Sequence, residues 1–157
     1  MTGLLKHCRL CPRACGADRT RTRGLCGAND QIEAARASLH LWEEPPISGT
    51  RGSGTVFFSH CSLGCVFCQN RQISRREAAG KAVSVHSLAR TFLSLERQGA
   101  HNINLVTGAH YVPHIIEALR LSRHQGLSVP IVYNSSGYES IDTLKLLDGW
   151  IDIYLPD

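Results

Sequence analysis

The sequence predicts an α/β fold in which parallel strands alternate with helices, as in the front portion of a (β/α) barrel. Three observations favour this fold class. From residue 55 onward, four short apolar segments alternate with three amphipathic segments. The apolar segments are continuous runs rather than polar/apolar alternations, which is typical of strands buried on both faces. Each amphipathic segment also lies between residues that start and stop helices, which indicates βαβ units.

The strands are expected at four places along the second part of the chain. The apolar runs are TVFFSH (55–60), NINLVTG (102–108), VPIVYN (129–134) and WIDIYLP (150–156). The last run reaches the end of the sequence with no covering helix after it, and an unpaired apolar strand edge is usually avoided. We therefore expect the front portion of a larger barrel, truncated after its fourth strand.

The helices between these strands have recognisable ends. They are expected over 84–99, 113–126 and 139–149. Ser84 is a suitable N-cap and Pro113 lies in a first turn, where its missing N–H is harmless. Gly99, Gly126 and Gly149 stand where helices end.

Composition divides the chain into two parts. Residues 1–50 form a cysteine-rich N-terminal extension, and residues 51–157 form the barrel portion. The stretch EEPPISGTRGSG (43–54) separates them, because its prolines and glycines interrupt regular structure. The stretch IEAARASLHLW (32–42) is ambiguous between a strand and a short helix.

Length and charge restrict the function classes. The 157 residues are 43% hydrophobic, which is enough for one ordinary core. The net charge of +4 is compatible with anionic ligands but does not by itself indicate a nucleic-acid-binding protein. No signal peptide and no apolar run of about 18 residues is visible, so we expect a cytoplasmic protein that does not enter a membrane. In the reducing cytosol, seven cysteines in two clusters indicate metal or iron–sulfur ligation rather than disulfides.

The second cysteine cluster directly follows the first predicted strand. Cys61, Cys65 and Cys68 have the spacing C-x3-C-x2-C. Ligand sites in α/β barrels lie on loops at the carboxyl ends of strands. Zinc is one candidate, but catalytic zinc sites usually mix histidine or carboxylate with cysteine. Alternatively, three thiolates hold three irons of a [4Fe–4S] cluster and leave the fourth iron free.

This triad resembles that of the radical S-adenosylmethionine enzymes. The resemblance rests on the spacing, on Phe67 just before the last cysteine, and on its position after a strand. The stretch EEPPISGTRGSGTVFFSHC (43–61) and CVFCQN (65–70) resemble iron–sulfur proteins related to pyruvate formate-lyase activating enzymes. The resemblance covers roughly residues 8–157.

The resemblance implies an oxidoreductase that uses a [4Fe–4S] cluster to cleave S-adenosylmethionine reductively, giving a 5′-deoxyadenosyl radical that abstracts hydrogen from a substrate. It implies flavodoxin or ferredoxin as electron donor, and a protein substrate such as a glycyl radical enzyme by analogy. No side chain is assigned as the catalyst, because the cluster and cofactor carry the chemistry.

The resemblance also implies residues that contact S-adenosylmethionine. Phe67 corresponds to an aromatic residue near the adenine, and a core aromatic is the alternative. Thr107 and Gly108 replace part of a Gly-Gly-Glu-Pro stretch that meets the methionine moiety. Polar residues after the third strand, among them Ser135, reach the ribose or sulfonium end, and the two assigned to the cofactor are Asn134 and Ser136.

The first cysteine cluster has four members and predicts a closed site. Cys8, Cys11, Cys15 and Cys26 have the spacing C-x2-C-x3-C-x10-C in a segment with little apolar periodicity. Structural zinc and an auxiliary iron–sulfur cluster both fit four thiolates.

Five arginines and two histidines remain to be interpreted. Arg9, Arg13, Arg19, Arg21 and Arg23 lie among the first cysteines without a stacking aromatic, which argues against nucleic acid and favours a solvated basic face or a docking patch for an acidic electron donor. His60 is expected to donate to cluster sulfurs. His110 is either a substrate-side group or, as we favour, a surface residue.

Two other functional classes stay open from the sequence. One is a non-catalytic iron–sulfur or zinc module for electron transfer or scaffolding. The other is an RNA-modifying radical S-adenosylmethionine enzyme that uses the arginine-rich extension.

Overall fold

The computed structural model describes residues 3–75 and 80–156 and has an α/β fold. A six-stranded sheet has the order β3-β1-β2-β4-β5-β6. Its strands are β1 (Ile32–His40), β2 (Ser53–Phe58), β3 (Lys81–Val83), β4 (Ile103–Val106), β5 (Ile131–Ser135) and β6 (Ile153–Pro156).

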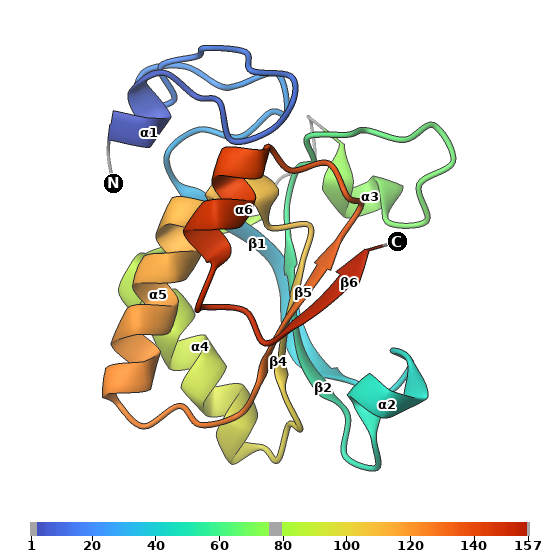
Figure 1. Cartoon of the computed structure of the whole chain (residues 1–157). Coiled ribbons are helices and arrows are strands. Elements are labelled where there is room, and N and C mark those ends of the chain that lie inside the picture. Colours follow the sequence, from blue (N-terminus) through green and yellow to red (C-terminus); the bar gives the residue numbers. More distant parts are fainter. Residues whose placement is uncertain (1–2, 76–79, 157) are drawn as a thin grey trace.

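Three main helices cover one face of this sheet (Figure 1). They are α4 (Val85–Arg97), α5 (Val112–His124) and α6 (Ile141–Leu147). The remaining helices are single turns, namely α1 (Gly3–Lys6), α2 (Pro45–Ser48), α3 (Arg71–Ser74) and the 3₁₀ turn η1 (Ala109–Tyr111). No helix in the described ranges is both long and apolar enough to cross a membrane.

The predicted α/β alternation is confirmed from β2 onward. Strands β2, β4, β5 and β6 are parallel neighbours, joined by α4, α5 and α6. The predicted helix starts are also confirmed. The Ser84 side chain accepts a hydrogen bond from the Ser87 N–H, and Pro113 lies in the first turn of α5.

The sheet is mixed rather than wholly parallel, which the sequence did not reveal. The ambiguous stretch 32–42 contains strand β1, which pairs antiparallel with β2 and with the short strand β3. Residues 32–40, placed by composition in the N-terminal extension, therefore lie in the same sheet as the barrel portion. The division near residue 50 stays a prediction.

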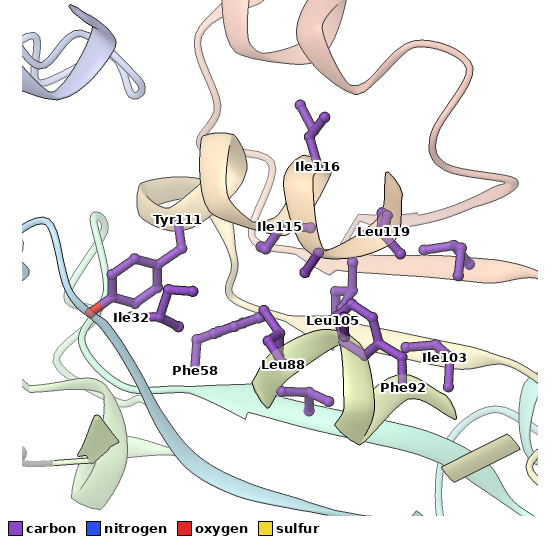
Figure 2. Close-up of a cluster of buried hydrophobic side chains, with 14 of the residues drawn as sticks. Ile32, Phe58, Leu88, Phe92, Ile103, Leu105, Tyr111, Ile115, Ile116 and Leu119 are labelled. Carbon is purple, nitrogen blue, oxygen red and sulfur yellow. The ribbon is translucent and has the colours of Figure 1, made fainter. Parts of the chain in front are cut away.

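The core lies between the helices and one face of the parallel strands (Figure 2). Parallel register aligns Val56 with Leu105 and Leu105 with Tyr133, so alternate side chains of β2, β4 and β5 form rows facing the helices. Phe92 of α4 and Ile115 of α5 are buried against these rows. This packing fixes where the carboxyl ends of the strands, and the loops after them, are placed.

Candidate metal centre

The loops after β2, β4 and β5 lie side by side at the carboxyl edge of the sheet. This follows from the parallel pairing of β2 with β4 and of β4 with β5. The loops carry Cys61, Cys65 and Cys68 after β2, Thr107 and Gly108 after β4, and Ser136 after β5. The topology thus brings most of the predicted site residues to one edge, where ligands bind in parallel α/β sheets.

The cysteine loop connects β2 to α3 and spans residues 59–70. All three thiols are free and half-buried. The Leu63 N–H donates to the Cys61 sulfur at 3.4 Å, and the Cys68 N–H donates to the Cys65 carbonyl at 3.3 Å. The Cys68 sulfur lies 3.4 Å from the Ser74 hydroxyl. The loop therefore holds three reduced thiols on one short segment directly after β2.

The three thiols do not form a metal-binding group in this structure. Across residues 3–75 and 80–156, no three side chains of His, Cys, Asp or Glu form a group that could hold a metal ion. This applies to both cysteine sets. Metal ligation by the triad and by the N-terminal cysteines therefore stays a prediction.

Three of the predicted cofactor residues lie together. The Thr107 N–H donates to the Asn134 carbonyl at 3.0 Å. Thr107 adopts a left-handed backbone conformation with φ of 58°, which costs free energy in a β-branched residue and often marks a functional loop. Gly108 packs closely, since a Cβ there would lie 2.7 Å from the Ile115 Cδ1 atom. The backbone after β4 is thus held against the end of β5.

Phe67 and Ser136 lie at the surface. Phe67 is 88% exposed and its neighbour Val66 is 83% exposed. Phe67 is therefore not a core aromatic, and that alternative is wrong. Ser136 is also exposed.

Ser135 is engaged within its own loop. Its hydroxyl donates to the Glu139 Oε2 atom at 2.7 Å and accepts from the Gly137 N–H at 2.8 Å. The Tyr133 hydroxyl donates to the other oxygen of Glu139 at 3.2 Å. Ser135 thus shapes the turn after β5.

A buried glutamate that the sequence analysis missed holds the residue before Cys61. Glu33, on β1, lies 3.1 Å from the His60 Nε2 atom and 3.3 Å from the Arg23 guanidinium. It also accepts from the Gly80 N–H at 3.3 Å. His60 has a positive φ of 68°, and its buried Nδ1 atom has no hydrogen-bond partner within residues 3–75 and 80–156. Glu33 is the single acidic residue of β1, and this was the available signal in the sequence.

His110 is buried, so the expectation of a surface histidine is wrong. Its Nε2 atom lies 2.8 Å from the Ser59 carbonyl. Burial lowers the pKa of His110 to about 3, although the hydrogen bond to Ser59 opposes this shift and the nearby Arg19 charge adds to it. His110 is therefore neutral at pH 7 and donates from Nε2 to the Ser59 carbonyl. Its Nδ1 atom is then an acceptor that has no partner in the described part of the chain.

Three of the five N-terminal arginines make contacts within the molecule. A solvated basic face is the wrong description for Arg19, which is buried, whereas Arg13 and Arg23 remain exposed. Arg13 donates to the Ser62 carbonyl at 2.6 Å and to the Leu63 carbonyl at 2.9 Å, across to the cysteine loop. Arg23 contacts Glu33. Arg19 is 0% exposed. Only Arg9 and Arg21 are exposed without such long-range contacts among the described residues.

The face of the sheet opposite the helices carries a second missed feature. Asn104 on β4 aligns with Thr55 and Val132 on the neighbouring strands. Its side chain is 0% exposed, and among the residues that the structure describes neither its amide nitrogen nor its oxygen has a hydrogen-bond partner. An unpaired buried amide is uncommon and marks a place where a water or ligand fits.

Comparisons with known proteins give one sequence relative. The uncharacterized protein MJ0674 of Methanocaldococcus jannaschii is 30% identical over 160 residues, a match that covers 98% of this chain and 46% of that protein. The chain thus spans about half the length of this relative. No family model matches the chain. No solved structure matches it either.

Proposed function

We propose that this chain is the front portion of a radical S-adenosylmethionine protein in which Cys61, Cys65 and Cys68 hold a [4Fe–4S] cluster. The observation that carries the proposal is the placement of three thiols, spaced C-x3-C-x2-C, on the loop directly after β2. This loop lies at the carboxyl edge of the parallel strands, beside the loops after β4 and β5. Three ligands leave one iron for a substrate or cofactor to bind.

The donor types suit such a cluster, and the three sulfurs would have to move closer together to hold it. All three donors are thiols, which iron–sulfur clusters prefer. They are half-buried, and the Leu63 N–H already points at the Cys61 sulfur. Hydrogen bonds of this kind to cluster sulfurs tune the reduction potential. When bound, the cluster supplies one electron to S-adenosylmethionine, which supplies the radical for hydrogen abstraction.

The chain's own residues would bind and orient the cofactor. Thr107 and Gly108 offer a closely packed backbone beside the end of β5, and Asn134 offers an amide from that strand. The exposed ring of Phe67 is available to cover the adenine once the cofactor is present. Ser136 is available at the surface of the next loop.

The proposal extends to partners and location. A low-potential donor such as flavodoxin or ferredoxin would reduce the cluster, and a protein substrate, by analogy a glycyl radical enzyme, would supply the hydrogen. Reduced thiols are compatible with a cytoplasmic protein. The contacts of Arg13, Arg19 and Arg23 within the chain argue against the RNA-modifying alternative.

The test is reductive cleavage of S-adenosylmethionine by the anaerobically reconstituted chain. With dithionite as reductant, we expect 5′-deoxyadenosine in chromatography, and no product from Cys65→Ser. Gln69→Ser, in the same loop, is the matched control and should retain the product, because Gln69 is exposed and no ligand. Product from both variants, or a protein that retains zinc and never a cluster, would contradict the proposal and favour a non-catalytic module.

A further inference from the structure

Arg19 is a buried cation without an acidic partner. Its side chain is 0% exposed, and its guanidinium donates to the carbonyl of His110 and to that of Asn29. Among the residues that the structure describes, no carboxylate forms an ion pair with Arg19. A buried charge without a compensating charge is strongly unfavourable. Carbonyl groups and the Tyr111 ring, 5.6 Å from the guanidinium carbon, contact Arg19, but no carboxylate of the described residues offsets its charge.

The N-terminal cysteines lie next to this cation. The Cys8 sulfur is 3.9 Å from the Arg19 Nη1 atom, and both Cys8 and Cys26 are buried. The Cys26 sulfur and the Arg19 Cδ atom border the same glycine, since a Cβ on Gly24 would lie 3.5 and 3.7 Å from them. Two thiols that are distant in sequence thus flank the Arg19 side chain.

The other two thiols belong to the same small cluster. Cys15 packs against the core formed by Leu5, Cys8 and Leu10. The Cys8 N–H donates to the Ala17 carbonyl at 3.1 Å, and the Gly16 N–H donates to the Cys8 carbonyl at 3.0 Å, which holds the chain around Cys15 against Cys8. The Ala14 N–H donates to the Cys11 carbonyl at 2.9 Å, so Cys11 lies in a tight turn between Cys8 and Cys15. All four cysteines therefore belong to one folded segment.

We propose that Cys8, Cys11, Cys15 and Cys26 bind one thiophilic metal centre as four thiolates, with Arg19 as its buried countercharge. Four thiolates around a divalent ion carry a net charge of −2, and the guanidinium offsets half of it. Such a site is closed and structural, because no position is left for substrate. Loading draws the sulfurs together and releases the thiol protons to solvent. Zinc and iron share this donor chemistry, and the test separates them.

The proposed centre would fasten the N-terminal segment across the carboxyl edge of the sheet. The Leu10 carbonyl accepts from the Thr143 hydroxyl at 2.8 Å, which ties the segment to α6. Arg19 reaches the loop after β4 through His110, and Arg13 reaches the cysteine loop after β2. Figure 1 shows this segment, in blue, at the same end of the sheet as α6 and α3. This role is independent of whether Cys61, Cys65 and Cys68 hold a cluster.

The test uses Co²⁺ and a full chain in which the second cysteine set is removed. In the triple variant Cys61→Ser, Cys65→Ser, Cys68→Ser, we expect one equivalent of Co²⁺ with the thiolate charge-transfer absorption of a tetrahedral sulfur site. Adding Cys8→Ser or the half-buried Cys11→Ser should abolish that absorption, while adding His7→Asn, an exposed potential ligand nearby, should leave it intact. Binding that survives both cysteine changes, or is lost with His7→Asn, would overturn the four-thiolate site.

The role of Arg19 has its own readout. In the same background, Arg19→Met should weaken Co²⁺ affinity roughly 10–100-fold, as loss of an outer partner typically does, and Arg19→Lys should restore most of it. Far-UV circular dichroism checks that both variants fold. Equal affinity for Arg19→Met and the parent would refute the countercharge. The metal and acid-labile sulfide contents of the purified triple variant then identify the centre. Zinc without sulfide, or iron with sulfide, would support the four-thiolate site. A protein that contains neither zinc nor iron would contradict the site.

Discussion

Burial keeps His110 neutral, and this has a consequence for stability against pH. Its pKa in the folded chain is about 3, against the ordinary value of 6.5 expected on unfolding. Below pH 6.5 the His110 imidazole binds a proton in the unfolded chain but remains neutral in the folded chain. The stabilising contribution is therefore complete above pH 6.5 and is lost as pH falls from 6.5 towards 3.

The prediction is a loss in the free energy of unfolding of about 2 kcal/mol between pH 7 and pH 5 from this residue alone. Urea unfolding at several pH values measures it. His110→Gln can still donate to the Ser59 carbonyl but does not titrate, so its stability should change less across this range. His114, whose pKa burial also lowers, remains in both proteins. Parallel pH profiles for the two proteins would show that His110 is not responsible.

Single residues also mark the limit of what the sequence could predict. The five N-terminal arginines look alike in sequence, yet Arg19 is buried and Arg13 bonds to the cysteine loop. Which arginine becomes buried depends on chain segments about 50 to 90 residues away, and no local pattern carries that information. By contrast, the sequence predicted the cysteine loop after a strand, because the spacing of cysteines within one loop depends only on neighbouring residues.

At the scale of elements, Gly54 allows β2 to pack closely against α4 and the segment that joins α4 to β4. A Cβ at this position would lie 2.9 Å from the Asn102 carbonyl oxygen and 3.0 Å from the Cβ atoms of Ala100 and Leu95. These neighbours are backbone or rigid side-chain atoms. We expect Gly54→Ala to lower the free energy of unfolding by about 1–3 kcal/mol through overpacking.

Denaturant unfolding monitored by circular dichroism checks this prediction. Gly3→Ala is the control, because a Cβ at Gly3 meets nothing within 4 Å. If Gly54→Ala and the parent have equal free energies of unfolding, the neighbouring atoms can move aside for the added methyl group, and the predicted overpacking is wrong.

The start of α4 gives a second prediction at this scale. The Ser84 hydroxyl accepts from the Ser87 N–H at 3.1 Å, which satisfies one free donor of the first turn. Ser84→Ala should cost about 1 kcal/mol in thermal or denaturant unfolding, and Ser84→Asp should restore the cap. If Ser84→Asp is as unstable as Ser84→Ala, the side chain does not act as a cap.

The sequence predicted the elements that have a helix cap or a buried apolar run. It did not predict the elements that lack both. The α4 cap and the parallel strands β2, β4 and β5 follow from local sequence, since each has a cap or a buried apolar run. Strand β3 has only three residues, and β1 carries charged residues, so neither gives a strong pattern. Their pairing with β2 is a long-range choice, which explains why the mixed sheet was missed.

For the whole molecule, the N-terminal segment and the cysteine loop behave as connected parts. Arg13 bridges them through two carbonyls, Ser62 and Leu63. Arg13→Ala should therefore speed amide hydrogen exchange in residues 60–70 by roughly 5–30-fold, since it removes two hydrogen bonds that contribute up to about 1 kcal/mol each. Arg9→Ala, an exposed arginine of the same segment, should leave exchange in that loop unchanged. Unchanged exchange with Arg13→Ala would show that the loop is held by other contacts.

The central claim is that the three cysteines after β2 hold a [4Fe–4S] cluster with one iron free for S-adenosylmethionine. The most direct measurement is electron paramagnetic resonance of the dithionite-reduced, anaerobically reconstituted chain, with and without S-adenosylmethionine, for the parent and for single serine variants of Cys61, Cys65 and Cys68. We predict a cluster signal that S-adenosylmethionine shifts in the parent and that each of the three substitutions removes. A shifted signal that persists in all three variants, or a parent signal that ignores S-adenosylmethionine, would contradict the account.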